Sequence, residues 1–160
     1  MPASPPKIER VKPPKWIVRS TSRLMRGLAT RSKTMSRFML VLHFTGRKTG
    51  REYEVPIGYA TEQGRLMTLS NDVWRLNFKG GRDLEVTYLR RRQPARATLE
   101  TDLEALADFY VEKFGEMGAK KVAADLGMKV NLDRAPTRDE WIEALRREGM
   151  NRIWIDLAPN

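Results

Sequence analysis

The spacing of apolar residues predicts two kinds of structure along this chain. Between residues 38 and 101, short apolar or alternating runs separated by turns are typical of β-strands. A similar alternation closes the chain. Five or six short antiparallel strands in this length favour a barrel, because closure removes exposed sheet edges. The runs lie at 38–45, 51–59, 65–70, 83–92, 96–101 and 152–157.

Helices are predicted outside the strand region and once within it. Two capping boxes, each a threonine followed three residues later by a glutamate, open helices that begin at 101 and 137 and end near 114 and 148. Residues 119–126 are expected to be helical as well, and a short helix is expected at 71–78. Residues 15–29 predict an amphipathic helix with an apolar stripe opposite three arginines. The expected fold class is α+β, mainly β, with an N-terminal helix and C-terminal helices packed on the barrel.

The length of 160 residues favours one domain with one core. Residues 1–14 carry five of the nine prolines and are expected to be an extended or disordered tail. Residues 15–37 follow as a basic amphipathic helix and linker. The barrel domain is expected at 38–160, with a helical insertion at about 102–149.

Positive charge is concentrated at the start of the chain. Of the net +10, residues 1–37 contribute ten Lys and Arg against one acidic residue. Such a segment could bind nucleic acid, an anionic membrane surface or an acidic ligand. Charge alone does not distinguish these three partners. Nucleic acid is not favoured, because no reading motif accompanies the charge and the aromatic residues are scattered. For residues 15–37 the sharper hypothesis is contact with an anionic bilayer; the alternative is a helix that shows its arginines to water.

Several kinds of chemistry are excluded by composition. The chain has no cysteine and one histidine, so it predicts no disulfide, no metal site and no Ser/His/Asp set. His43 shares its strand face with apolar residues and is interpreted as a hydrogen-bonded structural histidine. No run of about 18 apolar residues and no signal peptide is found, which favours a cytoplasmic protein, with attachment to the inner face of the membrane left open. An enzyme built from this chain needs a bound organic cofactor.

The candidate chemistry centres on a hairpin at 38–59. Its turn runs from Gly46 to Gly50, and the two glycines permit a tight backbone. At the tip, Arg47, Lys48 and the Thr49 hydroxyl gather donors suited to an anion such as a phosphate. The alternative is a solvated basic turn without a ligand.

These residues resemble the deazaflavin-dependent nitroreductase family of actinobacteria, which has the flavin-reductase-like split β-barrel. The resemblance covers most of the chain and is weakest at about 102–136. Its family pattern is a glycine-basic turn, a proline and an aromatic residue on the next strand, a strand ending in serine and a Trp-x-x-Asn helix. The residues that carry it here are Thr45–Gly50, Pro56, Tyr59, Ser70 and Trp74–Asn77.

The resemblance implies a site for coenzyme F420, a deazaflavin with a phosphate and an oligoglutamate tail; FMN is the alternative cofactor. By position, the implied cofactor-binding residues are Arg47, Lys48 and Thr49 in the phosphate-binding turn, Tyr53, Val55 and Pro56 on the strand along the cofactor, Ser70 and Asn71 near the ring, and Trp74 and Asn77 in the short helix beside it.

The implied function is hydride transfer from reduced deazaflavin to a small quinone-type or nitro-type acceptor, as in a nitroreductase or quinone reductase. Ser70, Trp74 and Asn77 are the candidate ring and acceptor contacts, and no residue is assigned as an acid or base. Only residues 71–73 separate Ser70 from Trp74, where family members have a longer loop. The alternative function is that of a split-barrel protein that binds another flavin, a haem-like molecule or a lipid without deazaflavin turnover. The expected oligomeric state is a monomer or a homodimer.

Overall fold

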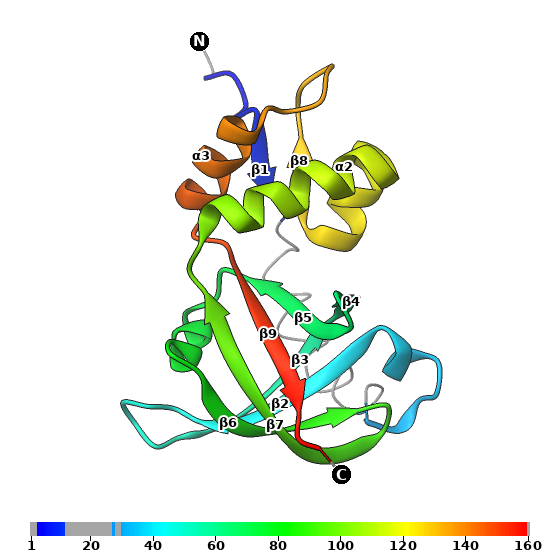
Figure 1. Ribbon diagram of the computed structural model, residues 1–160, viewed down its shortest axis with the longest axis vertical. Coiled ribbons are helices and arrows are strands. Elements are labelled where there is room, and N and C mark those ends of the chain that lie inside the picture. Colours follow the sequence, from blue (N-terminus) through cyan, green and yellow to red (C-terminus); the bar gives the residue numbers. More distant parts are fainter. Residues whose placement is uncertain (1–2, 12–26, 28–29, 160) are drawn as a thin grey trace. The chain divides into compact units, whose positions relative to one another are not determined.

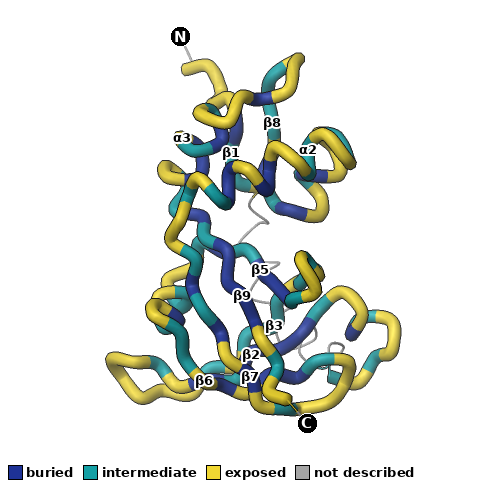
Figure 2. Tube along the Cα trace, in the orientation of Figure 1, coloured by how far each residue is buried: buried dark blue, intermediate teal, exposed yellow. Residues whose placement is uncertain are grey.

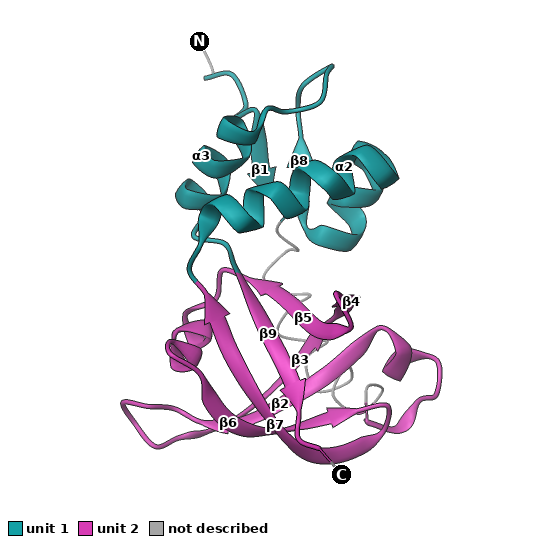
Figure 3. Ribbon diagram, viewed as in Figure 1, with its two compact units in different colours: residues 1–13, 101–151 teal, residues 14–100, 152–160 magenta. Residues whose placement is uncertain are grey.

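The computed structural model describes residues 3–11, 27 and 30–159. The predicted amphipathic helix at 15–29 lies outside the described residues, apart from residue 27. The chain divides into two compact units (Figure 3). Unit 1 comprises Met1–Pro13 and Thr101–Asn151, and unit 2 comprises Pro14–Glu100 and Arg152–Asn160.

Unit 2 is built on a seven-stranded antiparallel sheet (Figure 1). The strand order is β3-β2-β6-β7-β9-β5-β4. Two short 3-10 helices, η1 (Met35–Arg37) and η2 (Val73–Phe78), accompany the sheet. The strands are β2 (Met39–Thr45), β3 (Glu52–Gly58), β4 (Ala60–Glu62), β5 (Arg65–Ser70), β6 (Arg82–Tyr88), β7 (Arg91–Glu100) and β9 (Asn151–Leu157).

The sheet curls because its two edge strands are neighbours in the sequence. Seven strands spaced about 4.8 Å apart would place the edges of a flat sheet about 29 Å apart. Only Tyr59 separates β3 from β4, and the Thr68 hydroxyl of β5 donates to the Gly58 carbonyl of β3 over 2.9 Å. The sheet therefore bends into a half-barrel, and the predicted α+β fold with a barrel-like antiparallel sheet is confirmed.

The core of unit 2 lies on the concave face of this sheet. Alternate residues point inward, as expected for pleated strands, so Leu40, Leu42 and Phe44 of β2 are buried together with Val86 of β6. The buried positions follow the strands in Figure 2. Phe78, at the end of η2, is fully buried in the same cluster, and this contact anchors the short helix to the sheet.

One predicted boundary in this unit is wrong. The strand expected at 83–92 ends at Tyr88, and the chain reverses through Leu89 and Arg90 before β7 begins. Both turn residues adopt a positive φ, 49° and 67°, although neither is glycine, asparagine or aspartate. Because the usual turn residues are missing, the local sequence gave no turn signal.

Unit 1 combines two helices with a two-stranded antiparallel sheet. Strand β1 (Ile8–Arg10) pairs with β8 (Met128–Val130), and α2 (Leu103–Leu126) and α3 (Arg138–Glu148) complete the unit. The β1 strand lies within the segment expected to be extended or disordered. Gly118 interrupts α2 with a non-helical backbone, φ 80° and ψ 170°, between the two helices predicted there.

One of the two predicted N-terminal helix caps differs from the expectation. The Thr137 capping box is present, with the Thr137 hydroxyl accepting from the Glu140 N–H and the Glu140 carboxylate accepting from the Thr137 N–H. The predicted Thr101 capping box is wrong, because Asp102 is the N-cap and its carboxylate accepts from the Glu104 and Ala105 N–H groups. A carboxylate one residue later also accepts from the free Glu104 N–H and is favoured by the helix dipole.

The core of unit 1 is aromatic. Trp141 of α3 is fully buried and stacks on Tyr110 of α2, with ring centroids 4.8 Å apart. Ile8 of β1 and Met128 of β8 are buried as well. Among the described residues, no helix is both long enough and apolar enough to cross a bilayer.

Candidate functional site

The β2–β3 turn has a backbone that requires its two glycines. The Gly46 N–H donates to the Arg51 carbonyl over 2.7 Å, and the Gly50 N–H donates to the Gly46 carbonyl over 2.9 Å. Gly50 has a φ of 66°. A Cβ on Gly46 would lie 3.0 Å from the Tyr53 ring, so a side chain there would push the ring away.

The tip of this turn presents donors that the described chain leaves unused. Arg47 and Lys48 are exposed, and neither side chain pairs with a carboxylate of the described residues. Within the same residues, the N–H groups of Lys48 and Thr49 donate no hydrogen bond. The Thr49 hydroxyl accepts from the Arg51 N–H over 3.3 Å. Two cationic side chains and two free N–H groups at one turn are suited to an anion.

Asn77 of η2 joins the turn to the short helix. Its Oδ1 accepts from the Arg47 N–H, and its Nδ2 donates to the Trp74 carbonyl, each over 2.8 Å. One amide side chain therefore fixes the basic turn and the tryptophan helix at the same time. The residues are 30 positions apart in the sequence, and the structure brings them together.

Four aromatic rings form a cluster next to this junction. Phe44 and Tyr53 stack with centroids 5.3 Å apart, and Trp74 lies 6.2 Å from Phe44 and 6.3 Å from Phe78. Trp74 is only partly buried, and its indole N–H donates to Asp72 over 3.3 Å. Trp74 thus packs on the core cluster and also keeps some exposed surface.

The other predicted cofactor-binding residues do not line a common surface. Ser70 is 1 % exposed, and its hydroxyl accepts from the Asp72 N–H over 3.0 Å. The carbonyl of Asn71 accepts from the Arg75 guanidinium. Val55 packs against the core, whereas Pro56 points to the opposite face of the sheet.

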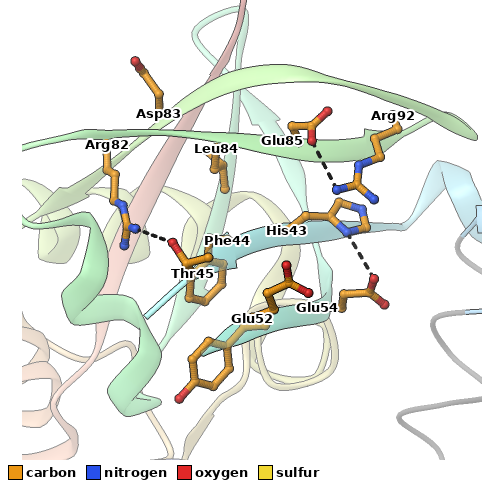
Figure 4. Close-up of a pocket in the computed structure, with 11 residues that line it drawn as sticks. His43, Phe44, Thr45, Glu52, Glu54, Arg82, Asp83, Leu84, Glu85 and Arg92 are labelled. Atoms are coloured by element: carbon orange, nitrogen blue, oxygen red, sulfur yellow. Dashed lines mark hydrogen bonds and ion pairs between the residues drawn. The ribbon is translucent and has the colours of Figure 1, made fainter. Parts of the chain in front are cut away.

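A hollow of about 520 Å³ lies over strands β2, β3 and β6 and shares Phe44 and Tyr53 with the aromatic cluster (Figure 4). His43, Arg92 and the carboxylates of its lining come from the sheet face opposite the core. Of the predicted cofactor-binding residues only Tyr53 lines it. The sequence analysis did not identify the four carboxylates of this hollow. They alternate along β3 and β6, on either side of His43, and are Glu52, Glu54, Asp83 and Glu85. The lining residues are His43, Phe44, Thr45, Glu52, Tyr53, Glu54, Arg82, Asp83, Leu84, Glu85 and Arg92.

His43 is held in place by hydrogen bonding, as the structural interpretation predicted. Its Nε2 lies 2.8 Å from the Thr87 hydroxyl, within hydrogen-bond distance. Its buried Nδ1 has no hydrogen-bond partner among the described residues and lies 3.7 Å from a Glu54 carboxylate oxygen (Figure 4). Burial lowers the pKa of His43, and the nearby Arg92 lowers it further, while Glu54 and Glu85 act in the opposite direction. This lowered pKa favours the neutral imidazole. Among the described residues, no group of three or more acidic or histidine side chains is arranged to hold a metal ion.

No protein-family model matches the chain, and no curated protein matches its sequence. The chain is similar in structure to a split-barrel-like protein of Mycobacterium smegmatis that is described as a domain-swapped dimer. The two chains share 15 % identity, with a TM-score of 0.43, and the match covers 92 % of this chain and 100 % of the other. A likeness of this size says nothing about cofactor or substrate.

Proposed function

We propose that this protein is an F420-dependent reductase whose cofactor lies between the β2–β3 turn and η2. The observation that carries the proposal is the double hydrogen bond of Asn77, which joins Arg47 to Trp74. The two parts of the site implied by the family resemblance, the phosphate-binding turn and the tryptophan helix, therefore belong to one local structure.

The turn suits the anionic part of such a cofactor. Arg47 and Lys48 have no carboxylate partner among the described residues, so a phosphate or glutamate tail would not have to displace an ion pair. The free N–H groups of Lys48 and Thr49 would add short-range donors. Charge-assisted hydrogen bonds of this kind contribute about 1.5–3 kcal/mol each.

The aromatic cluster suits the ring. Trp74 would cover one side of a planar ring and exclude water, with Phe44 and Phe78 fixing the position of the indole from behind. Asn77 would act as a positioning residue, because both ends of its amide are occupied by the chain. When bound, reduced F420 supplies a hydride from C5 to an electron-poor acceptor such as a quinone or a nitro compound, and the protein contributes orientation and a dry surface.

The proposal is tested first by binding. Fluorescence titration of the full chain with F420, FMN and FAD should give the tightest binding with F420. In the Arg47→Ala/Lys48→Ala variant the affinity should fall by about 2–4 kcal/mol, or about 30- to 900-fold in Kd, since the two contributions do not add fully. Folding should change little, because both side chains are exposed.

The matched control is Lys120→Ala/Lys121→Ala, which removes two neighbouring exposed lysines of unit 1. It should bind F420 as wild type does. If both double variants lose affinity equally, the turn is not the binding site, and general positive charge explains the binding.

Turnover is tested separately by the loss of reduced-F420 absorbance with menadione and with a nitroimidazole. Wild type should oxidise the cofactor faster than buffer does, and Arg47→Ala/Lys48→Ala should do so only at higher cofactor concentration. Tight binding without turnover across a broad acceptor panel would replace the reductase by a ligand-binding split-barrel protein. Preference for FMN would keep the site and change the cofactor.

A further inference from the structure

The β6–β7 hairpin is closed by residues that its backbone disfavours. Leu89 and Arg90 both have a positive φ, 49° and 67°. Two-residue hairpin turns of this kind are normally formed by Asn-Gly or Asp-Gly, because asparagine and glycine tolerate the left-handed region and bulky residues do not. Leucine at such a position is unfavourable for the backbone, and 48 % of the Leu89 surface is exposed.

A second exposed apolar residue precedes β2, the strand that pairs with β6. Phe38, just before β2, is 63 % exposed. Its carbonyl accepts from the Tyr59 N–H over 3.1 Å, and the Tyr59 ring meets the Tyr88 ring edge to face at 5.4 Å. Strands β2 and β6 pair with Val41 opposite Thr87, so the start of β2, which follows Phe38, and the end of β6, which precedes Leu89, lie at the same end of the sheet. We name this end, with its neighbouring arginines, the Phe38–Leu89 corner.

The corner carries exposed positive charge. Arg37, Arg90 and Arg91 are exposed, and none of them pairs with a carboxylate of the described residues. The sequence contains no acidic residue at 30–51 and none at 86–99. Each exposed apolar residue is therefore followed or preceded in the sequence by arginines that have no carboxylate partner among the described residues.

We propose that the Phe38–Leu89 corner docks on an anionic lipid surface. Apolar side chains placed among cations suit a bilayer interface, where Phe and Leu enter the acyl boundary while arginines meet phosphate headgroups. The aliphatic Leu89 favours lipid over nucleic acid, because bases are recognised mainly by stacking on aromatic rings. This surface is independent of the β2–β3 turn and of any cofactor.

The decisive variant is Leu89→Asn/Arg90→Gly. It installs the residues that the turn backbone prefers, so the melting temperature should stay the same or rise. It also removes one apolar side chain and one cation, and the partition coefficient on vesicles of phosphatidylcholine with about 30 % phosphatidylglycerol should fall at least about tenfold. A purely structural role for the turn predicts no loss of lipid binding in this variant.

The matched control is Val111→Ser/Lys120→Ser, which removes one exposed apolar residue and one cation from unit 1. It should sediment with the vesicles as wild type does. Because the chain has no cysteine, Leu89→Cys can carry a polarity-sensitive dye, and its emission should shift to the blue on anionic vesicles and not on phosphatidylcholine alone. The same dye on Val111→Cys should not respond.

Two results would overturn the proposal. Equal vesicle binding of wild type and Leu89→Asn/Arg90→Gly would show that the corner does not touch lipid, whatever else holds the protein there. Binding of wild type to a single-stranded RNA oligonucleotide, lost in this variant and unmatched by anionic vesicles, would assign the corner to nucleic acid instead.

Discussion

Asn77→Ala tests whether the basic turn is held in place by the short helix. The substitution removes the acceptor for the Arg47 N–H and the donor to the Trp74 carbonyl, both at 2.8 Å. Alanine leaves Phe78, which anchors η2 in the core, untouched. We therefore expect a local loosening of the turn, with the half-barrel intact.

The size of the effect follows from the exposure of the two bonds. A net hydrogen bond contributes about 0.5–1.5 kcal/mol, and water can replace a partner that is exposed. The Arg47 N–H is exposed and the Trp74 carbonyl is partly buried, so about 1–2 kcal/mol in total is expected. For a chain of this size each kcal/mol lowers the melting temperature by about 2–4 °C, and the expected fall is about 2–8 °C.

Cofactor affinity should fall more than a purely structural change would produce. A turn that samples other conformations must be ordered again on binding, and this lowers the affinity of a pre-organised site. We expect F420 to bind about tenfold more weakly to Asn77→Ala by fluorescence titration. Asn131→Ala is the matched control, because the Asn131 amide also donates over 2.8 Å to a backbone carbonyl, that of Pro6 in unit 1. It removes one such bond, so it should cost about 0.5–1.5 kcal/mol and leave F420 binding unchanged.

One result would refute the reasoning. If Asn77→Ala melts lower yet binds F420 with wild-type affinity, the bridge stabilises the fold without organising the site. If Asn131→Ala weakens binding to the same extent, the loss reflects general stability.

Two further predictions concern pH and capping. Burial lowers the pKa of His43, so the unfolded chain takes up this proton at a higher pH than the folded chain does, and stability should fall as the pH drops below about 6.5. In His43→Gln this part of the fall, measured as melting temperature from pH 7.5 to 5, should disappear, and an unchanged slope would contradict the assignment. Thr137→Ala should destabilise unit 1 by about 1 kcal/mol in urea unfolding, Thr137→Ser should restore most of it, and F420 affinity should not change; an effect on affinity would show that the two units are coupled.

The hairpin at the centre of the site could be predicted because its signals are local. Gly46 and Gly50 mark the turn, and the flanking runs pair with Phe44 opposite Tyr53. The capping box at Thr137 is equally local. Where a local signal is missing or ambiguous, prediction fails, as at Leu89 and Arg90, whose positive φ is imposed by the sheet.

The contacts between distant segments could not be derived from residue patterns. Asn77 reaches Arg47 because the burial of Phe78 fixes η2 against the sheet, and no periodicity records that contact. The resemblance alone placed the two residues in one site. The carboxylates at Glu52 and Glu54 alternate visibly in the sequence, but nothing local shows that β6, rather than β5, lies on the other side of β2.

The same core that closes the half-barrel also sets the geometry of the turn. Phe44 contacts Tyr53, Trp74 and Phe78, so one buried ring touches the strand after the turn and both aromatic residues of η2. Asn77 of η2 accepts a hydrogen bond from the Arg47 N–H, so the position of η2 also fixes the turn. The buried core therefore fixes the position of the turn that carries the exposed donors of Arg47 and Lys48. A flexible basic loop would offer the same charges, but it would lose more conformational entropy on binding.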